Sequence, residues 1–278
     1  MSKKLAIIAI HGMGSTEEDF ADPLRQHLES RLEPSQWNQI YFDKIYYQGL
    51  IQEHQEAIWK NMRRVGLRWK RLREEMLYSF SDPATIAQGA SNPESIYLQV
   101  QRTITKAIEN ARKNLVDADA PIVIIAQSLG GHVISNYIWD AQSQAKGKEV
   151  IGVWRDDKDK LLSAGSQEEV DFLRMRTLRF LLTTGCNIPL FVAGHKAIVA
   201  IDKPDPLRDF DWINFYDRDD VLGWPLKPLS PSYKALVTED VDITVGSLLT
   251  SFTPFSHLFY WDDAEFLSTV AALIRGML

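Results

Sequence analysis

The stretch that decides the fold class is Pro121-Ile-Val-Ile-Ile-Ala-Gln-Ser-Leu-Gly-Gly-His132. Its first half is the most hydrophobic run in the chain, which is typical of a strand at the centre of a sheet with both faces buried. Its second half starts a segment whose apolar residues recur with helical periodicity, through Val133, Tyr137 and Ile138. A serine at so sharp a change from strand to helix is held with its hydroxyl exposed beyond the carboxyl end of the strand. The pattern therefore predicts a nucleophile at Ser128.

Small residues flank this serine, as they must where a strand and a helix nearly touch. Gly130 meets the requirement on one side, and Ala126 departs from the usual glycine on the other side by one methyl group. The turn also leaves the backbone N–H of Leu129 at a helix start, where an oxyanion would develop. A structural or phosphate-binding turn would use the same glycines. The lack of a Lys-Ser/Thr pair and of a third glycine in dinucleotide register disfavours a phosphate site.

Apolar runs alternate with helical periodicity along the rest of the chain, which is the pattern of a parallel sheet covered by helices. The predicted strands are residues 5–10, 39–47, 121–126, 188–193, 212–216 and 241–245. The clearest predicted helices begin with Asp22 as N-cap, with Asn92 and Pro93 in a helix over 92–116, and with Asp262 and Asp263 near the end of the chain.

The chain contains no internal repeat, low-complexity tract or linker-like segment, so we expect a single α/β domain over residues 1–278. Two segments, 49–91 and 144–170, lie between the main predicted elements. We expect both to be helical insertions over the rim of the sheet, where α/β proteins bind their ligands.

A serine hydroxyl becomes a good nucleophile when an imidazole accepts its proton and a carboxylate holds that imidazole. Of the six histidines, His257 alone lies in a loop after the last predicted strand and just before the final helix. For the carboxylate we prefer Asp220, which follows the strand 212–216 after a short loop, and Asp217 is the alternative. The alternative interpretations are that His257 is an ordinary loop histidine and that the acidic residues belong to a polar loop. The acidic residues lack a recognisable cation-loop spacing, so we expect no metal.

Taken together, these residues resemble the α/β-hydrolase superfamily, in its lipase- and esterase-like branch. His11-Gly12 after the first strand resembles the oxyanion loop of that family, and the order Ser128, Asp220, His257 along the chain is the family's order. The resemblance implies a six-stranded sheet, strands 3–8 of the family, in the order 4-3-5-6-7-8. It also implies a second oxyanion donor, the backbone N–H of Met13, beside that of Leu129.

The hypothesis is therefore a serine hydrolase that cleaves carboxylic esters through an acyl-enzyme intermediate and uses no cofactor. Two alternatives stay open. The same residues would serve a thioesterase or an acyltransferase. An inactive hydrolase-like domain could instead act as a binding or scaffold module, and Ala126 is the one local feature that points to it.

Composition limits the partners and the compartment. The net charge of −6 over 278 residues argues against a nucleic-acid binder, which needs a basic surface. The single cysteine, Cys186, excludes a disulfide within the chain and fits a reducing compartment. The apolar run 5–10 is too short for a signal peptide or a membrane span, so we expect a cytoplasmic protein.

The segment from Lys60 to Arg73 is strongly basic, although the chain as a whole is acidic. Seven basic and no acidic residues lie between Lys60 and Arg73, and apolar residues recur at three- and four-residue spacing over 58–76 (Ile58, Met62, Val65, Trp69, Leu72 and Met76). The spacing predicts an amphipathic helix with a cationic face. Such a helix either packs on the domain or lies on an anionic membrane surface, where a lipid ester would be the substrate.

Overall fold

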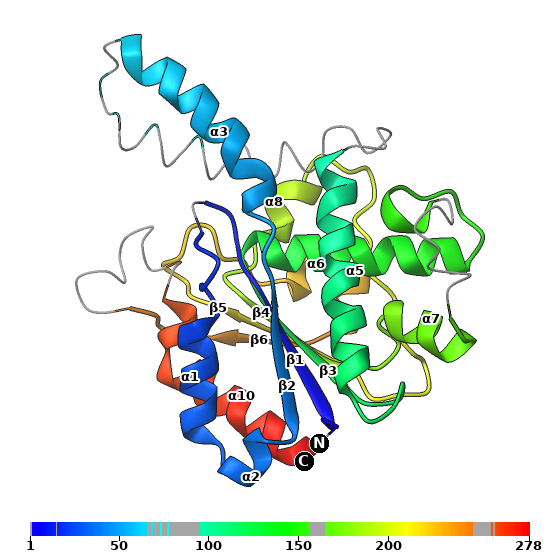
Figure 1. Ribbon diagram of the computed structural model, residues 1–278. Coiled ribbons are helices and arrows are strands. Elements are labelled where there is room, and N and C mark those ends of the chain that lie inside the picture. Colours follow the sequence, from blue (N-terminus) through cyan, green and yellow to red (C-terminus); the bar gives the residue numbers. More distant parts are fainter. Residues whose placement is uncertain are drawn as a thin grey trace.

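The described residues place six parallel strands in one sheet (Figure 1). The computed structural model describes residues 2–14, 16–65, 68, 70, 73, 77, 95–155, 165–246, 257 and 259–278. The strands are β1 (Leu5–Ile10), β2 (Ile40–Ile45), β3 (Ile122–Gln127), β4 (Leu178–Thr184), β5 (Asp211–Tyr216) and β6 (Val237–Asp242). Every neighbouring pair is parallel, in the order β2-β1-β3-β4-β5-β6. This is the order that the resemblance implied, and the predicted α/β-hydrolase fold is confirmed.

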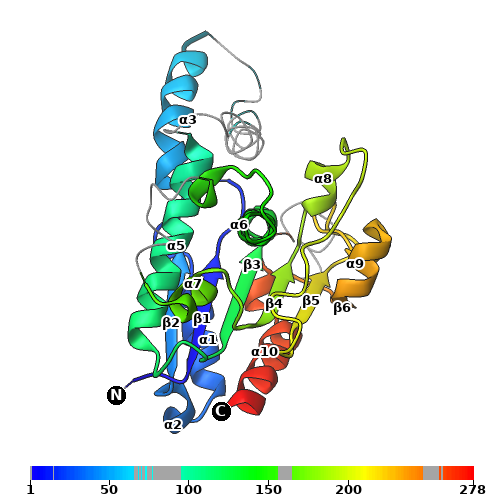
Figure 2. The same cartoon turned by 90° about the vertical axis from the view of Figure 1, so that its right-hand side faces the viewer.

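Helices cover both faces of the sheet (Figures 1 and 2). One face carries α5 (Ile96–Asn114), α6 (Leu129–Ala145) and α7 (Gln167–Leu173), and the other carries α1 (Asp22–Arg31) and α10 (Ala264–Met277). The remaining helices are α2 (Pro34–Trp37), α3 (Gly49–Met62), α8 (Ile188–Val192) and α9 (Pro231–Leu236). Single 3-10 turns occur at Arg63–Val65, Gly152–Trp154, Lys227–Leu229 and Tyr260–Asp262.

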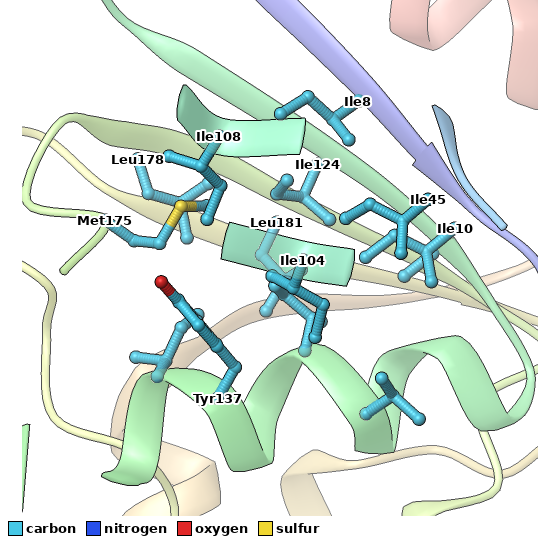
Figure 3. Close-up of a cluster of buried hydrophobic side chains, with 14 of the residues drawn as sticks. Ile8, Ile10, Ile45, Ile104, Ile108, Ile124, Tyr137, Met175, Leu178 and Leu181 are labelled. Atoms are coloured by element: carbon cyan, nitrogen blue, oxygen red, sulfur yellow. The ribbon is translucent and has the colours of Figure 1, made fainter. Parts of the chain in front are cut away.

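The central strands supply side chains to two cores, because successive side chains of a strand point to opposite faces. All of β1 is fully buried. Ile8 and Ile10 belong to the core under α5 and α6, where Figure 3 shows them with Ile104 and Ile124. Ile7 and its like-facing neighbours belong to the core under α1 and α10. Burying each of these side chains contributes about 1.5–3 kcal/mol, so the sheet is a rigid support for whatever its carboxyl edge carries.

The sequence-based prediction for the fourth strand is wrong. Residues 188–193 were predicted to form it, but Ile188–Val192 is helix α8, and the strand beside β3 is Leu178–Thr184. Short apolar runs do not distinguish a strand from a buried helix. Pro189 supports the helix, because a proline fits the first helical turn but removes a hydrogen bond from a central strand.

Several predicted boundaries also move. The sixth strand runs over Val237–Asp242 instead of 241–245, although the N–H of Ile243 still donates to the carbonyl of Tyr216. Helix α5 begins at Ile96 with Ser95 as its cap, so its start is not at Asn92 and Pro93, which lie outside the described residues. The N-cap of α1 is Ala21 rather than Asp22.

The two predicted insertions differ in position. Helix α3, from the segment 49–91, follows β2 and projects from the carboxyl edge of the sheet (Figure 1). The described part of 144–170 instead contacts α5 through α7 and the turn Gly152–Trp154. None of the described helices combines the length and apolar character needed to cross a bilayer.

Candidate active site

Ser128 lies in a strained turn between β3 and α6. Its backbone has φ 52° and ψ −120°, a conformation that costs a residue with a side chain about 1–3 kcal/mol. The turn is held because the N–H of Ser128 donates to the carbonyl of Thr184 (2.8 Å) and its own carbonyl accepts from the N–H of Gly131 (3.1 Å). Such strain is what places a nucleophilic serine above the carboxyl edge of a sheet.

The loop after β1 is in close contact with this turn. A Cβ atom added to Gly12 would lie 2.7 Å from the Cβ of Ser128, and one added to Gly130 would lie 2.6 Å from the carbonyl oxygen of His11. Real Cβ atoms do not approach other atoms so closely, so only glycine fits at either position. Ala126, the departure noted in the sequence, is fully buried in β3. The two loops are therefore packed backbone against backbone, as an oxyanion hole requires.

His257 and Asp220 form a buried hydrogen-bonded pair. Nδ1–H of His257 donates to Oδ2 of Asp220 at 2.7 Å, and the side chains are 6% and 0% exposed. The side chain of Gln127, directly before the serine, donates to the carbonyl of His257 (2.9 Å) and ties this loop to the turn of Ser128. Because a carboxylate only accepts, Nδ1 carries a proton, and in the neutral ring Nε2 then presents a lone pair. Within the described residues, Nε2 is buried and has no hydrogen-bond partner.

Asp220 is surrounded by donors. Besides His257, it accepts hydrogen bonds from the hydroxyl of Tyr260 (2.9 Å) and from the N–H of Leu222 (2.9 Å). Burial opposes ionisation, but the donors, with His257 first among them, lower the pKa of Asp220 below its ordinary value. The carboxylate is therefore charged and correctly oriented to hold an imidazole.

Asp217, the alternative acid, faces elsewhere. Its Oδ1 accepts from the N–H of Asp219 and its Oδ2 from the N–H of Val245, both at 2.8 Å. These bonds join the loop after β5 to the chain after β6. Among the described residues, no group of three or more histidine, cysteine, aspartate or glutamate side chains is arranged to hold a metal.

His11 holds the loop that contains Gly12 and Met13. Its Nδ1–H donates to the carbonyl of Gly12 (2.8 Å), and its Nε2 accepts from the N–H of Tyr47 (3.1 Å). The hydroxyl of Tyr47 donates to the carbonyl of His11 (3.0 Å). Burial lowers the pKa of His11 to about 4, so the ring is neutral at pH 7. With both nitrogens occupied, His11 orders the loop and does not exchange protons with a ligand.

A cavity of about 320 Å³ opens at this place. Ser128, His257, Gly12 and Met13 all line it. The rest of the wall is mixed: Phe20, Leu24 and Trp261 supply apolar side chains, and polar residues such as Thr16 and Glu17 also line it. The predicted nucleophile, base and oxyanion loop thus surround one space that a small acyl group could enter.

Sequence reasoning missed Asn187. This side chain is 0% exposed, and its Nδ2 donates to Oγ of Ser128 at 2.9 Å. The misplaced fourth strand explains the omission, because a strand at 188–193 puts Asn187 before the strand, at the edge away from the site. With the strand at Leu178–Thr184, residue 187 follows it and reaches the carboxyl edge. Polar residues after a strand were the signal that identified the other site residues.

No family model matches the chain, and no curated protein matches its sequence. Among solved structures, the chain is similar to the catalytic core domain of an acetyl xylan esterase from Trichoderma reesei (11% identity, 100% of each chain covered, TM-score 0.42). It is also similar to an esterase from the archaeon Pyrobaculum calidifontis (12% identity, 99% and 78% covered, TM-score 0.46) and to a carboxylesterase from Lactobacillus plantarum (10% identity, 100% and 88% covered, TM-score 0.44). The strand order and the strained serine turn, rather than these scores, identify the fold.

Proposed function

We propose that the protein hydrolyses carboxylic esters, with Ser128 as nucleophile, His257 as general base and Asp220 as the acid that orients it. One observation carries the proposal: the strained serine and His257 border the same cavity, and His257 is hydrogen-bonded to Asp220. Fold alone does not determine function, so the proposal depends on this site.

The reaction has two steps. Oγ of Ser128 attacks the ester carbonyl while its proton passes to Nε2 of His257, and the carbonyl oxygen becomes an oxyanion held by the N–H groups of Leu129 and Met13. The C–O bond to the alcohol then breaks, and the alcohol leaves with the proton of His257. Water next gives its proton to His257 and attacks the acyl carbon, and collapse of this second intermediate releases the acid and restores the hydroxyl of Ser128.

Asp220 makes the imidazole an effective base. A carboxylate bonded to Nδ1–H fixes the tautomer with Nε2 free and stabilises the imidazolium that forms during the attack. The bonds from Tyr260 and Leu222 keep the carboxylate in place.

The unpaired Nε2 of His257 favours catalysis over the scaffold alternative. A buried nitrogen without a partner among the described residues costs stability. An enzyme of the proposed kind needs such a group to accept a proton from its nucleophile. Transfer of the acyl group to an acceptor other than water, and thioester cleavage, use the same residues and differ only in the second reactant.

The substrate we propose is a small-molecule or lipid ester whose acyl part fills the apolar side of the cavity. Helix α3 supports the lipid case. Of its large apolar side chains, Ile51 and Trp59 are buried, whereas Ile58 (47%) and Met62 (49%) are exposed. The basic side chains that follow are exposed wherever the structure describes them (Lys60, Arg63, Arg64, Arg68, Lys70 and Arg73). Trp69, Leu72, Met76 and the side chain of Val65 lie outside the described residues.

This outer part of α3 combines the two features that bind anionic membranes, exposed apolar side chains and clustered positive charge. Binding to vesicles with 30% anionic lipid, compared with neutral vesicles, tests the contact. We expect binding to the anionic vesicles that weakens as salt rises, and weaker binding still after Ile58→Ser with Met62→Ser. Equal affinity for both kinds of vesicle, or none, contradicts the membrane contact and leaves the hydrolase proposal intact.

The function itself is tested by labelling with a fluorophosphonate, followed by peptide mapping, and by turnover of p-nitrophenyl esters of graded chain length. We expect modification of Ser128 alone, and loss of both labelling and turnover in Ser128→Ala. A modified residue other than Ser128, or turnover that survives Ser128→Ala, contradicts the assignment.

The choice of acid is tested by a pair of isosteric variants. Asp220→Asn cannot hold the required tautomer, and we expect kcat to fall by about 10³- to 10⁴-fold. Asp217→Asn loses a loop bond, so we expect a lower melting temperature with kcat within about tenfold of the wild type. The reverse pattern would make Asp217 the acid.

A further inference from the structure

We propose that Asn187 is a catalytic residue of this site: its amide donates a hydrogen bond to Oγ of Ser128 and stabilises the charge on that oxygen chiefly while the acyl group leaves it. The inference rests on the proposed function, because it requires an acyl group on Ser128. The sequence around Ser128 does not indicate this contact, because the two residues are 59 positions apart.

The topology brings Asn187 to the serine. β4 pairs with β3 in a register that sets Thr184 beside Gln127, so the chains leave the sheet side by side at its carboxyl edge. Ser128 is the next residue on one chain, and Asn187 is the third residue after Thr184 on the other. The Nδ2–Oγ distance of 2.9 Å is that of a good N–H···O hydrogen bond, and both side chains are buried.

Asn187 makes this contact instead of the capping hydrogen bond that is usual at its position. It is the N-cap residue of α8, a position where asparagine side chains usually accept a hydrogen bond from the first turn of the helix. In the described structure its side chain makes no capping bond, and its Oδ1 is buried without a partner. The residue therefore gives up both a cap and the pairing of a buried oxygen. Such a departure is expected where a site requires it.

The direction of the bond fits the proposed reaction. Asn187 donates an N–H to a lone pair of Oγ and does not compete for the hydroxyl proton, which remains available for Nε2 of His257. An amide turned the other way would accept that proton through Oδ1 and withhold it from the base. The bond from Asn187 therefore leaves the hydroxyl proton of Ser128 free for the base that the proposed reaction requires.

The bond acts most strongly in deacylation, because a group accelerates a step only when it binds the transition state better than the ground state. Before acylation, Oγ is a hydroxyl oxygen and already accepts the bond. In the acyl-enzyme, Oγ is an ester oxygen, which is a poor acceptor. When the C–Oγ bond breaks, the electron pair goes to Oγ, which is negative until it takes the proton from His257. The Asn187 hydrogen bond therefore strengthens more between the acyl-enzyme and the transition state of deacylation than between the free hydroxyl and the transition state of acylation.

The test is a stopped-flow measurement of p-nitrophenyl acetate turnover, which separates the burst of acylation from the steady state set by deacylation. For Asn187→Ala we expect deacylation to slow by about 10- to 100-fold and acylation by less than about tenfold, so that acyl-Ser128 accumulates and is detected by mass spectrometry. Asn187→Asp keeps the shape but replaces the donor by an acceptor, and we expect at least as large a loss of deacylation.

Asn214→Ala is the matched control. Asn214 is equally buried, and its amide donates to Asp240 and to the carbonyl of Trp224 away from the cavity. We expect it to lower stability without changing the ratio of the two rates.

Three results would overturn the inference: unchanged deacylation in Asn187→Ala, equal slowing of both steps, or retained deacylation in Asn187→Asp, which would mean that the amide accepts. A wild-type protein that never forms acyl-Ser128 contradicts the proposed function and removes the inference with it. A burst in the wild type with any of the three results contradicts the inference alone.

Discussion

Replacing His11 by glutamine tests how the loop of Gly12 and Met13 is held and what acid does to it. The ring of His11 is buried, and its Nε2 accepts from the N–H of Tyr47. A proton on Nε2 would break this bond and place a charge in a buried site, which is why burial lowers the pKa of His11 from 6.5 to about 4.

The lowered pKa makes stability depend on pH. Between pH 6.5 and 4 the unfolded chain binds a proton at His11 and the folded protein does not, so the unfolded state binds more protons and acid favours it. The stability that comes from the neutral ring of His11 is complete above pH 6.5 and is lost as the pH falls toward 4. One pKa unit corresponds to about 1.4 kcal/mol, so His11 lowers the free energy of unfolding by about 2 kcal/mol between pH 7.5 and pH 5.

Urea unfolding of the wild type and of His11→Gln at pH 7.5, 6.5, 5.5 and 5 measures this difference. We expect the variant to be the less stable protein at pH 7.5 and the advantage of the wild type to shrink by about 2 kcal/mol by pH 5. His132→Gln is a useful comparison, because burial also lowers the pKa of His132 to about 4. It should alter the pH dependence in the same direction while leaving ester turnover at pH 7.5 unchanged. Parallel curves for the wild type and His11→Gln would refute the reasoning.

Two further substitutions probe the site. Gly12→Ala places a methyl group 2.7 Å from the Cβ of Ser128, so we expect kcat/KM for short esters to fall by at least about 100-fold. Gly194→Ala is the control, because nothing lies within 4 Å of the new methyl group, and it should leave kcat/KM unchanged. Similar losses in both variants would point to a general effect on folding. Tyr260→Phe removes a donor to Asp220, so the pKa of the Asp220 carboxyl rises and we expect kcat/KM to fall by about three- to tenfold. An unchanged kcat/KM would show that this hydroxyl does not support the carboxylate.

Local patterns in the sequence were sufficient to predict the fold class. A buried parallel strand is recognisable by its continuous apolar run, and the change from strand to helix at Ser128 is a short-range feature with a steric cause. The same reasoning failed at 188–193, where an apolar run holds a proline in the first turn of a helix. Runs of this length report burial and not backbone conformation.

The candidate site was predicted in part. The order of Ser128, Asp220 and His257 along the chain, with each residue after its own strand, was enough to group them. Sequence left Asp217 as an alternative, and the structure separates the two carboxylates by their contacts: Asp220 is hydrogen-bonded to His257, whereas Asp217 is bonded to backbone N–H groups.

By itself, then, the sequence determined which segments are strands and helices at most positions, how they alternate, and that a serine stands in a sharp turn at the edge of a sheet. Only the tertiary structure decided which side chains surround that serine. The bonds of Asn187 to Ser128, of Tyr47 to His11 and of Tyr260 to Asp220 join residues 59, 36 and 40 positions apart. Periodicity and turn chemistry act over a few residues, whereas these contacts exist because parallel strands bring distant loops to the same edge of the sheet.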